Sequence, residues 1–135
     1  MSLTGVLLAT HKMQEIMMSR KIKFRFLNID GWNYWEPKTT ESPYSDKMTF
    51  WQILDNYGDY ETLGQYTGLK DKNGVEIYEG DILHGNILSL TDDFTVKCGR
   101  GGFIIAAIAS TGSFPITYIN AGKVIGNIHE NPELL

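Results

Sequence analysis

Asp81 and His84 are the residues whose types and spacing come closest to acid–base chemistry in this chain. A carboxylate beside an imidazole can orient that ring as a general base. In a strand, however, side chains at odd spacing point to opposite faces of the sheet. We therefore expect Asp81 to brace the corner at Gly80 by accepting hydrogen bonds from nearby backbone amides, and we predict no catalytic residues and no enzyme activity.

Metal and thiol chemistry find equally little support in the sequence. A metal site gathers three or four clustered ligands, whereas His11, His84 and His129 are scattered along the chain. The single cysteine, Cys98, alternates with apolar residues, so we expect a small core residue there. We predict no metal and no cofactor.

Gly99-Arg100-Gly101-Gly102 could cradle a phosphate or contact RNA. A phosphate-binding loop leads into a helix, whose N-terminus supplies aligned donors. Here the loop leads into the apolar run Phe103–Ala109, which reads as a central strand buried on both faces. This context favours an ordinary hairpin turn.

A basic and aromatic pattern is the first candidate binding surface. Cations interleaved with aromatic rings are typical of proteins that bind single-stranded nucleic acid. The alternative is that the aromatic rings build a small core while the cations form a solvated face. The pattern places three cations on one face of a strand and three aromatic residues on its hairpin partner: Lys21, Lys23, Arg25, Trp32, Tyr34 and Trp35.

An acidic cluster is the second candidate surface. Such a cluster can steer association with a basic protein partner, or it can simply be solubilising charge. It consists of Asp71, Glu76, Glu79 and Asp81, followed by Asp92-Asp93.

The elements that position these residues are predicted to be short strands. Lys21–Leu27 alternates between apolar and charged residues, and Asp30-Gly31 predicts a hairpin turn after it. Asn73-Gly74 is the preferred pair for a type I′ turn, after which Val75 and Ile77 should point inward and Glu76 and Tyr78 outward. Further strands are predicted over Ile116–Ile119 and Lys123–Ile128.

Short strands separated by glycine turns predict an all-β fold. We expect a small SH3-like barrel over residues 67–135, with a smaller N-terminal β region over residues 19–66. Residues 1–18 read as a leader or vector-derived segment.

Composition limits the function further. The chain has 135 residues, with 12 Lys and Arg against 16 Asp and Glu, which gives a net charge of −4. That balance opposes general binding to duplex DNA. One cysteine fits a reducing cytosol, and no apolar run approaches the roughly 20 residues that cross a bilayer. We expect a cytoplasmic protein with no membrane partner.

Three blocks of the sequence resemble the YopX family of phage and prophage proteins. They are Arg20–Arg25, Gln65–Leu83 and Val124–Leu135, and the resemblance extends over most of residues 20–135. It implies a β-rich protein from a phage or prophage. It implies no mechanism, because no activity is established for the family.

These observations favour a non-enzymatic module that binds a host or phage protein. The expected carriers are the Trp32–Trp35 strand and the acidic hairpin. The alternative and less favoured hypothesis is single-stranded nucleic-acid binding through Lys21, Lys23 and Arg25. Homo-oligomerisation is plausible, since small β proteins often hide apolar strands in interfaces.

Overall fold

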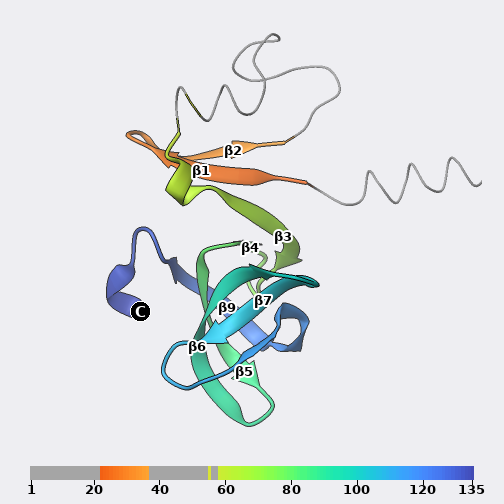
Figure 1. Ribbon diagram of the computed structural model, residues 1–135. Coiled ribbons are helices and arrows are strands. Elements are labelled where there is room, and N and C mark those ends of the chain that lie inside the picture. The colour runs from red at the N-terminus through yellow and green to blue at the C-terminus, as the bar shows by residue number, and fades with distance from the viewer. Residues whose placement is uncertain (1–21, 37–54, 56–57) are drawn as a thin grey trace, which may run out of the picture.

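The computed structural model describes residues 22–36, 55 and 58–135. The predicted leader at residues 1–18 and the predicted binding residue Lys21 lie outside these residues. Figure 1 shows two stacked β layers, with β1, β2 and β3 in the upper one and a strongly curled sheet below.

Both sheets are antiparallel, and their strands range in length from 3 to 10 residues. The four-stranded sheet has the order β2 (Gly31–Trp35), β1 (Phe24–Asn28), β3 (Gly64–Lys70) and β4 (Glu76–Tyr78). The five-stranded sheet has the order β8 (Ser113–Pro115), β7 (Gly102–Ala107), β6 (Leu90–Gly99), β5 (Asp81–Ile87) and β9 (Asn120–Asn127). Three short 3-10 turns complete the described chain: η1 (Tyr60–Thr62), η2 (Ile116–Tyr118) and η3 (Pro132–Leu134).

The all-β prediction is confirmed, and the five-stranded sheet curls into a half-barrel (Figure 1). The SH3-like detail of that barrel stays a prediction. The predicted boundary at residues 66 and 67 falls inside β3. The first half of this strand pairs with β1, and its residues Tyr66 and Lys70 pair with β4. β3 therefore joins the N-terminal hairpin to β4 within the four-stranded sheet.

The N-terminal hairpin forms as its turn residues predict. β1 and β2 pair from Phe24 opposite Trp35 to Asn28 opposite Gly31. Gly31 adopts a φ of 116°, which glycine reaches without steric cost. Asp30-Gly31 thus closes the predicted turn.

The barrel core comes from alternation along β5 and β6. Leu83, Phe94 and Ile105 are fully buried at its centre, where each such side chain stabilises the fold by about 1.5–3 kcal/mol. Gly85 is needed on β5, because a Cβ there would lie 2.9 Å from the side chain of Ile119. The missing side chain lets the segment after η2 pack closely on the sheet.

Two strand predictions at this end of the barrel are wrong. Ile116–Ile119 is not a strand, because η2 forms directly after Pro115 and the amide of Ile119 bonds back to the carbonyl of Ile116. β7 is not buried on both faces, since Ile105 is its one buried residue. The β6–β7 hairpin runs on past the core, so Cys98 near its tip is exposed rather than a core residue.

Candidate binding site

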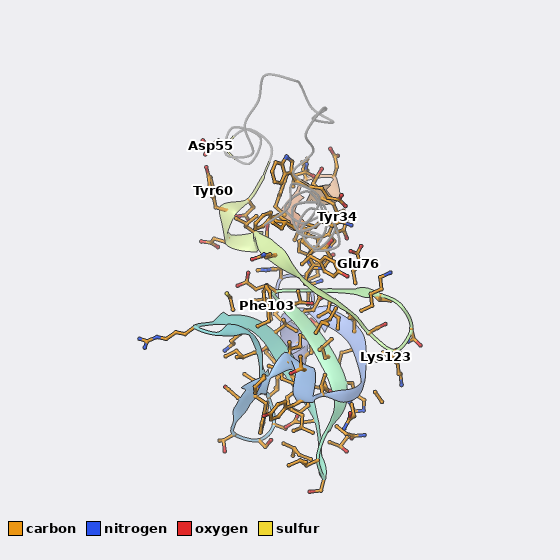
Figure 2. All side chains as sticks on the ribbon, turned by 90° about the vertical axis from the view of Figure 1, so that its right-hand side faces the viewer. Tyr34, Asp55, Tyr60, Glu76, Phe103 and Lys123 are labelled. Carbon is orange, nitrogen blue, oxygen red and sulfur yellow. The ribbon has the colours of Figure 1, made fainter. Side chains whose placement is uncertain are left out.

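The predicted basic and aromatic residues meet Glu76 and Asp81 of the predicted acidic cluster where the N-terminal hairpin packs on β4 and on the start of β5. We call this region the interlayer junction. Figure 2 shows Tyr34 from the N-terminal hairpin above Glu76 of β4. The junction brings together Lys23, Arg25, Trp32 and Tyr34 from the N-terminal hairpin with Glu76, Tyr78, Asp81 and Glu130 from the rest of the chain.

Arg25 lies at the centre of the junction. Its Nη2 donates to Oδ1 of Asp81 at 2.6 Å, and the two side chains are only 8% and 2% exposed. The guanidinium carbon lies 4.2 Å from the ring centroid of Trp32 and 4.7 Å from that of Tyr78. Cation–π contacts of this kind strengthen when they are shielded from water. The expectation of a cation on an open strand face is therefore wrong for Arg25.

Asp81 connects the junction to the Gly80 corner. Its second oxygen accepts a hydrogen bond from the amide of Tyr78 at 2.7 Å, which confirms the bracing role predicted from sequence. Burial raises the pKa of the Asp81 carboxyl, while Arg25 and the Tyr78 amide act in the opposite direction. His84 lies on the other face of β5, where it contacts Asp93 at 2.8 Å in an exposed pair. Asp81 and His84 therefore form no common site.

Lys23 and Trp32 are also engaged inside the molecule. The Nζ of Lys23 lies 3.0 Å from a carboxylate oxygen of Glu76 and 3.1 Å from one of Glu36. Burial alone would lower the pKa of Lys23, but these two carboxylates raise it. The indole nitrogen of Trp32 donates to Glu130.

The other two aromatic residues of the predicted surface, Tyr34 and Trp35, also contact neighbouring rings. Tyr34 meets Tyr78 edge-on, with ring centroids 5.6 Å apart. Trp35 pairs with Phe24 across the hairpin, with centroids 6.3 Å apart. The prediction that Tyr78 points outward is wrong: Tyr78 is 2% exposed, because Tyr34, Tyr66 and Arg25 pack against its ring.

A cavity of about 370 Å³ lies at the junction, lined in part by Arg25, Tyr34 and Tyr78. Two buried side-chain atoms in the described residues lack a hydrogen-bond partner, and both belong to this lining: Nε of Arg25 and the hydroxyl of Tyr78. Burial raises the pKa of the Tyr78 hydroxyl above its ordinary value. Since both atoms are themselves shielded from solvent, they offer a ligand no accessible donor.

Asp71, predicted to belong to an acidic surface, is a buried structural residue. Its oxygens accept from the amides of Asn73 at 2.8 Å, Val75 at 2.9 Å and Val124 at 3.0 Å. Burial would raise the pKa of Asp71, but these amides and Lys123 hold it below its usual value. The carboxylate thus fixes the β3–β4 turn and ties it to β9.

The β3–β4 turn differs from the predicted type. A type I′ turn needs a positive φ at both central residues, and in the described chain Gly74 has one while Asn73 does not. Val75, predicted to point inward, is 48% exposed as it leaves this turn. Glu79 contributes its backbone to the fold: its amide donates to Gln65, and its carbonyl lies 2.6 Å from where a Cβ on Gly64 would be.

The β3–β4 turn forms one wall of a second cavity, of about 350 Å³. We call it the lysine-rimmed groove. Its other wall is η2 and the start of β9, and the amide of Lys72 joins the two walls by donating to the carbonyl of Gly122 at 3.0 Å. The lining residues are Leu69, Lys70, Asp71, Lys72, Ile77, Ile116, Thr117, Ile119, Ala121 and Gly122.

The charges at this groove are not compensated as those of the junction are. Lys70 and Lys72 are exposed, and no salt bridge joins either of them to a carboxylate of the described chain. Glu76 lies opposite Lys70 in the β3–β4 pair, but its carboxylate binds Lys23. Figure 2 places Lys123 just below the turn, on the same side of the molecule.

This groove was not predicted from the sequence. Lys70 and Lys72 flank Asp71 in the block that carries the family resemblance, and their position beside a turn was the available signal. The opposite wall could not be placed from sequence, because the pattern of Ile116–Ile119 predicts a strand. The part of the chain that the structure describes has no group of three metal-binding side chains. Among the same residues, none of the helices has the length and apolar character needed to cross a bilayer.

Comparisons with known proteins agree with the resemblance seen in the sequence. The family model described as YopX protein matches residues 11–135. A crystal structure of protein EF1440 from Enterococcus faecalis is similar, with 30% sequence identity and a TM-score of 0.50. The similarity covers 84% of this chain and 97% of that one. No curated protein matches the sequence.

Proposed function

We propose that this chain, which belongs to the YopX family, is a non-enzymatic module that binds another protein. The observation that carries the proposal is the lysine-rimmed groove. Its lining includes Leu69 and Ile119, and Leu69 is 37% exposed. Exposed apolar side chains that gather in a concave site, rather than scatter singly, mark an interaction surface.

The rigidity of the groove supports a binding role. Its walls come from segments about 50 residues apart in sequence, held together by Asp71 and by the Lys72–Gly122 hydrogen bond. A preformed site loses little conformational entropy when a partner binds. We therefore assign the binding surface to this groove rather than to the Trp32–Trp35 strand and the acidic hairpin.

Single-stranded nucleic-acid binding gains no support from the described residues. Lys23 and Arg25 are paired with carboxylates inside the molecule, and the ring of Trp32 stacks on Arg25. As part of the same proposal, the protein acts in the bacterial cytoplasm as a phage or prophage accessory factor. Its partner is then a host or phage protein.

Affinity capture from a bacterial lysate, with and without nuclease, tests the proposal. We expect the wild-type protein to retain a protein partner after nuclease treatment, and Leu69→Asp to lose it. Leu88→Asp is the matched control, because Leu88 is 92% exposed on the β5–β6 turn, which does not line the groove. Capture that disappears with nuclease, or that is equally strong with Leu69→Asp, contradicts the proposal.

A further inference from the structure

We propose that the lysine-rimmed groove receives an acidic segment of the partner protein, with an aliphatic side chain in the groove and carboxylates on Lys70 and Lys72. This inference rests on the proposed function and adds the chemistry of the bound segment.

The floor of the groove selects an aliphatic group. Ile77 and Ile116 are 3% and 6% exposed and form its base, while Ile119 and Leu69 form its sides. None of the lining residues is aromatic. A volume of about 350 Å³ is at the small end of the range for ligand pockets. Such a volume suits one or two side chains of a peptide rather than a large flat ring system.

The rim selects negative charge. Lys70 and Lys72 are both exposed lining residues, whereas the carboxylate between them is buried and accepts three backbone hydrogen bonds. The two ammonium groups therefore give the rim a positive potential within a chain whose net charge is −4. Complementary carboxylates on a partner would be attracted to this rim and held in one orientation.

Nucleic acid fits the same rim less well. Proteins that hold single strands pair their cations with aromatic rings on which bases stack, and the groove offers an aliphatic floor instead. An acidic peptide uses both features of the groove, because its carboxylates meet the lysines and its aliphatic side chain meets the floor.

Selection from a random peptide library displayed on phage tests the inference. The immobilised proteins are the wild type, the groove variant Lys70→Gln/Lys72→Gln, and the control Lys97→Gln/Arg100→Gln. Lys97 and Arg100 are exposed cations on the β6–β7 hairpin, so the control removes the same charge away from the groove. Circular dichroism and urea unfolding verify that both variants keep the wild-type fold.

We expect the wild type and the control to enrich peptides that carry Asp or Glu beside Leu, Ile, Val or Met. Synthetic versions of these peptides should bind the groove variant about tenfold more weakly than the control, since two favourable charge pairs are lost. Their affinity for the wild type should fall as salt is raised, because exposed charge pairs are screened.

Enrichment of neutral or basic peptides that still depend on Leu69 would overturn the acidic-segment inference while leaving the proposed protein-binding function intact. No enrichment, or enriched peptides that bind the groove variant and the control equally, would also overturn the inference. The lysate capture distinguishes these outcomes from failure of the proposed function. If the protein-binding function is correct, Leu69→Asp still loses the captured partner.

Discussion

The interlayer junction and the lysine-rimmed groove use charge in opposite ways. At the junction, Arg25 and Lys23 are paired with Asp81 and Glu76 and are largely buried. At the groove, Lys70 and Lys72 are exposed and have no carboxylate partner in the described chain. The same residue types therefore hold the layers together in one place and remain available to a partner in the other.

This difference shows which charges to interpret as functional. A buried cation that pairs with a carboxylate is needed for stability, because removing the carboxylate leaves an uncompensated buried charge. An unmatched cation at the surface contributes little to stability. Substitutions should consequently unfold the protein at the junction and change binding at the groove.

The largest effect is expected from Asp81→Ala. The substitution leaves the Arg25 guanidinium buried without its partner and removes the acceptor for the Tyr78 amide. We expect the free energy of unfolding in urea to fall by about 3–5 kcal/mol. Asp93→Ala, which deletes the carboxylate of the exposed pair with His84, should cost less than about 1 kcal/mol. Similar losses in the two variants would break the distinction between buried and exposed charge pairs.

Trp32→Ala should have the next largest effect. It removes the ring that stacks on Arg25 and the hydrogen bond to Glu130. We expect a loss of about 2–3 kcal/mol in urea unfolding. Trp32→Phe keeps a ring over Arg25 and should cost about 1 kcal/mol, the part due to the hydrogen bond. If Trp32→Ala unfolds at the wild-type urea concentration, the junction does not depend on this contact.

Acid should weaken the turn that builds the groove. The pKa of Asp71 is lowered from 3.8 in the folded protein, because backbone amides outweigh the effect of burial. A lowered folded pKa contributes stability that is present above the unfolded value and is lost as pH falls through the folded one. The stability difference between wild type and Asp71→Asn should therefore be largest above about pH 5 and should narrow below about pH 4. Urea unfolding from pH 7 to pH 2.5 measures this, and a gap that widens in acid would contradict it.

A smaller and opposite effect is expected from Ala121→Gly at the groove. Ala121 has a φ of 52°, a left-handed conformation that costs a residue with a Cβ about 1–2 kcal/mol. Glycine relieves this cost but adds entropy to the unfolded chain, so we expect a net gain of about 0.5 kcal/mol. Ala106→Gly, within the extended strand β7, should instead lose about 0.5–1 kcal/mol. Thermal unfolding of both variants tests the contrast in sign.

The smallest effect on stability should come from Lys70→Gln/Lys72→Gln. Neither lysine is paired within the described residues, so the free energy of unfolding should change by less than about 0.5 kcal/mol. A large destabilisation would mean that these lysines hold the fold together, as those of the junction do. Parallel urea titrations with Lys97→Gln/Arg100→Gln as the control decide the point.

Local sequence chemistry predicted much of the fold. Asp30-Gly31 and Gly80 mark real corners, and alternation along β5 and β6 predicts the buried faces. The 3-10 turn at η2 escaped prediction because Ile116–Ile119 reads equally well as a strand. The burial of Tyr78 escaped it because a period of two residues cannot reveal that both faces of β4 are covered.

The candidate site could be predicted much less well. The ion pair between Arg25 and Asp81 joins residues 56 positions apart, so the basic strand and the acidic hairpin looked like two independent surfaces. The groove depends on a tertiary contact between the β3–β4 turn and β9. Pattern and spacing specify the elements, but which charges neutralise each other is decided only when the elements pack.

An NMR titration tests the central distinction between the two regions most directly. The ¹⁵N-labelled protein would be titrated with a peptide enriched by the library selection, and its amide shifts followed. We predict that the perturbed amides cluster at residues 69–72 and 116–122, while those of Trp32–Trp35 and Glu79–Asp81 stay unchanged. Perturbations centred on Trp32–Trp35 and the Gly80 corner, with the groove unaffected, would show that the junction is the binding surface and would contradict the account.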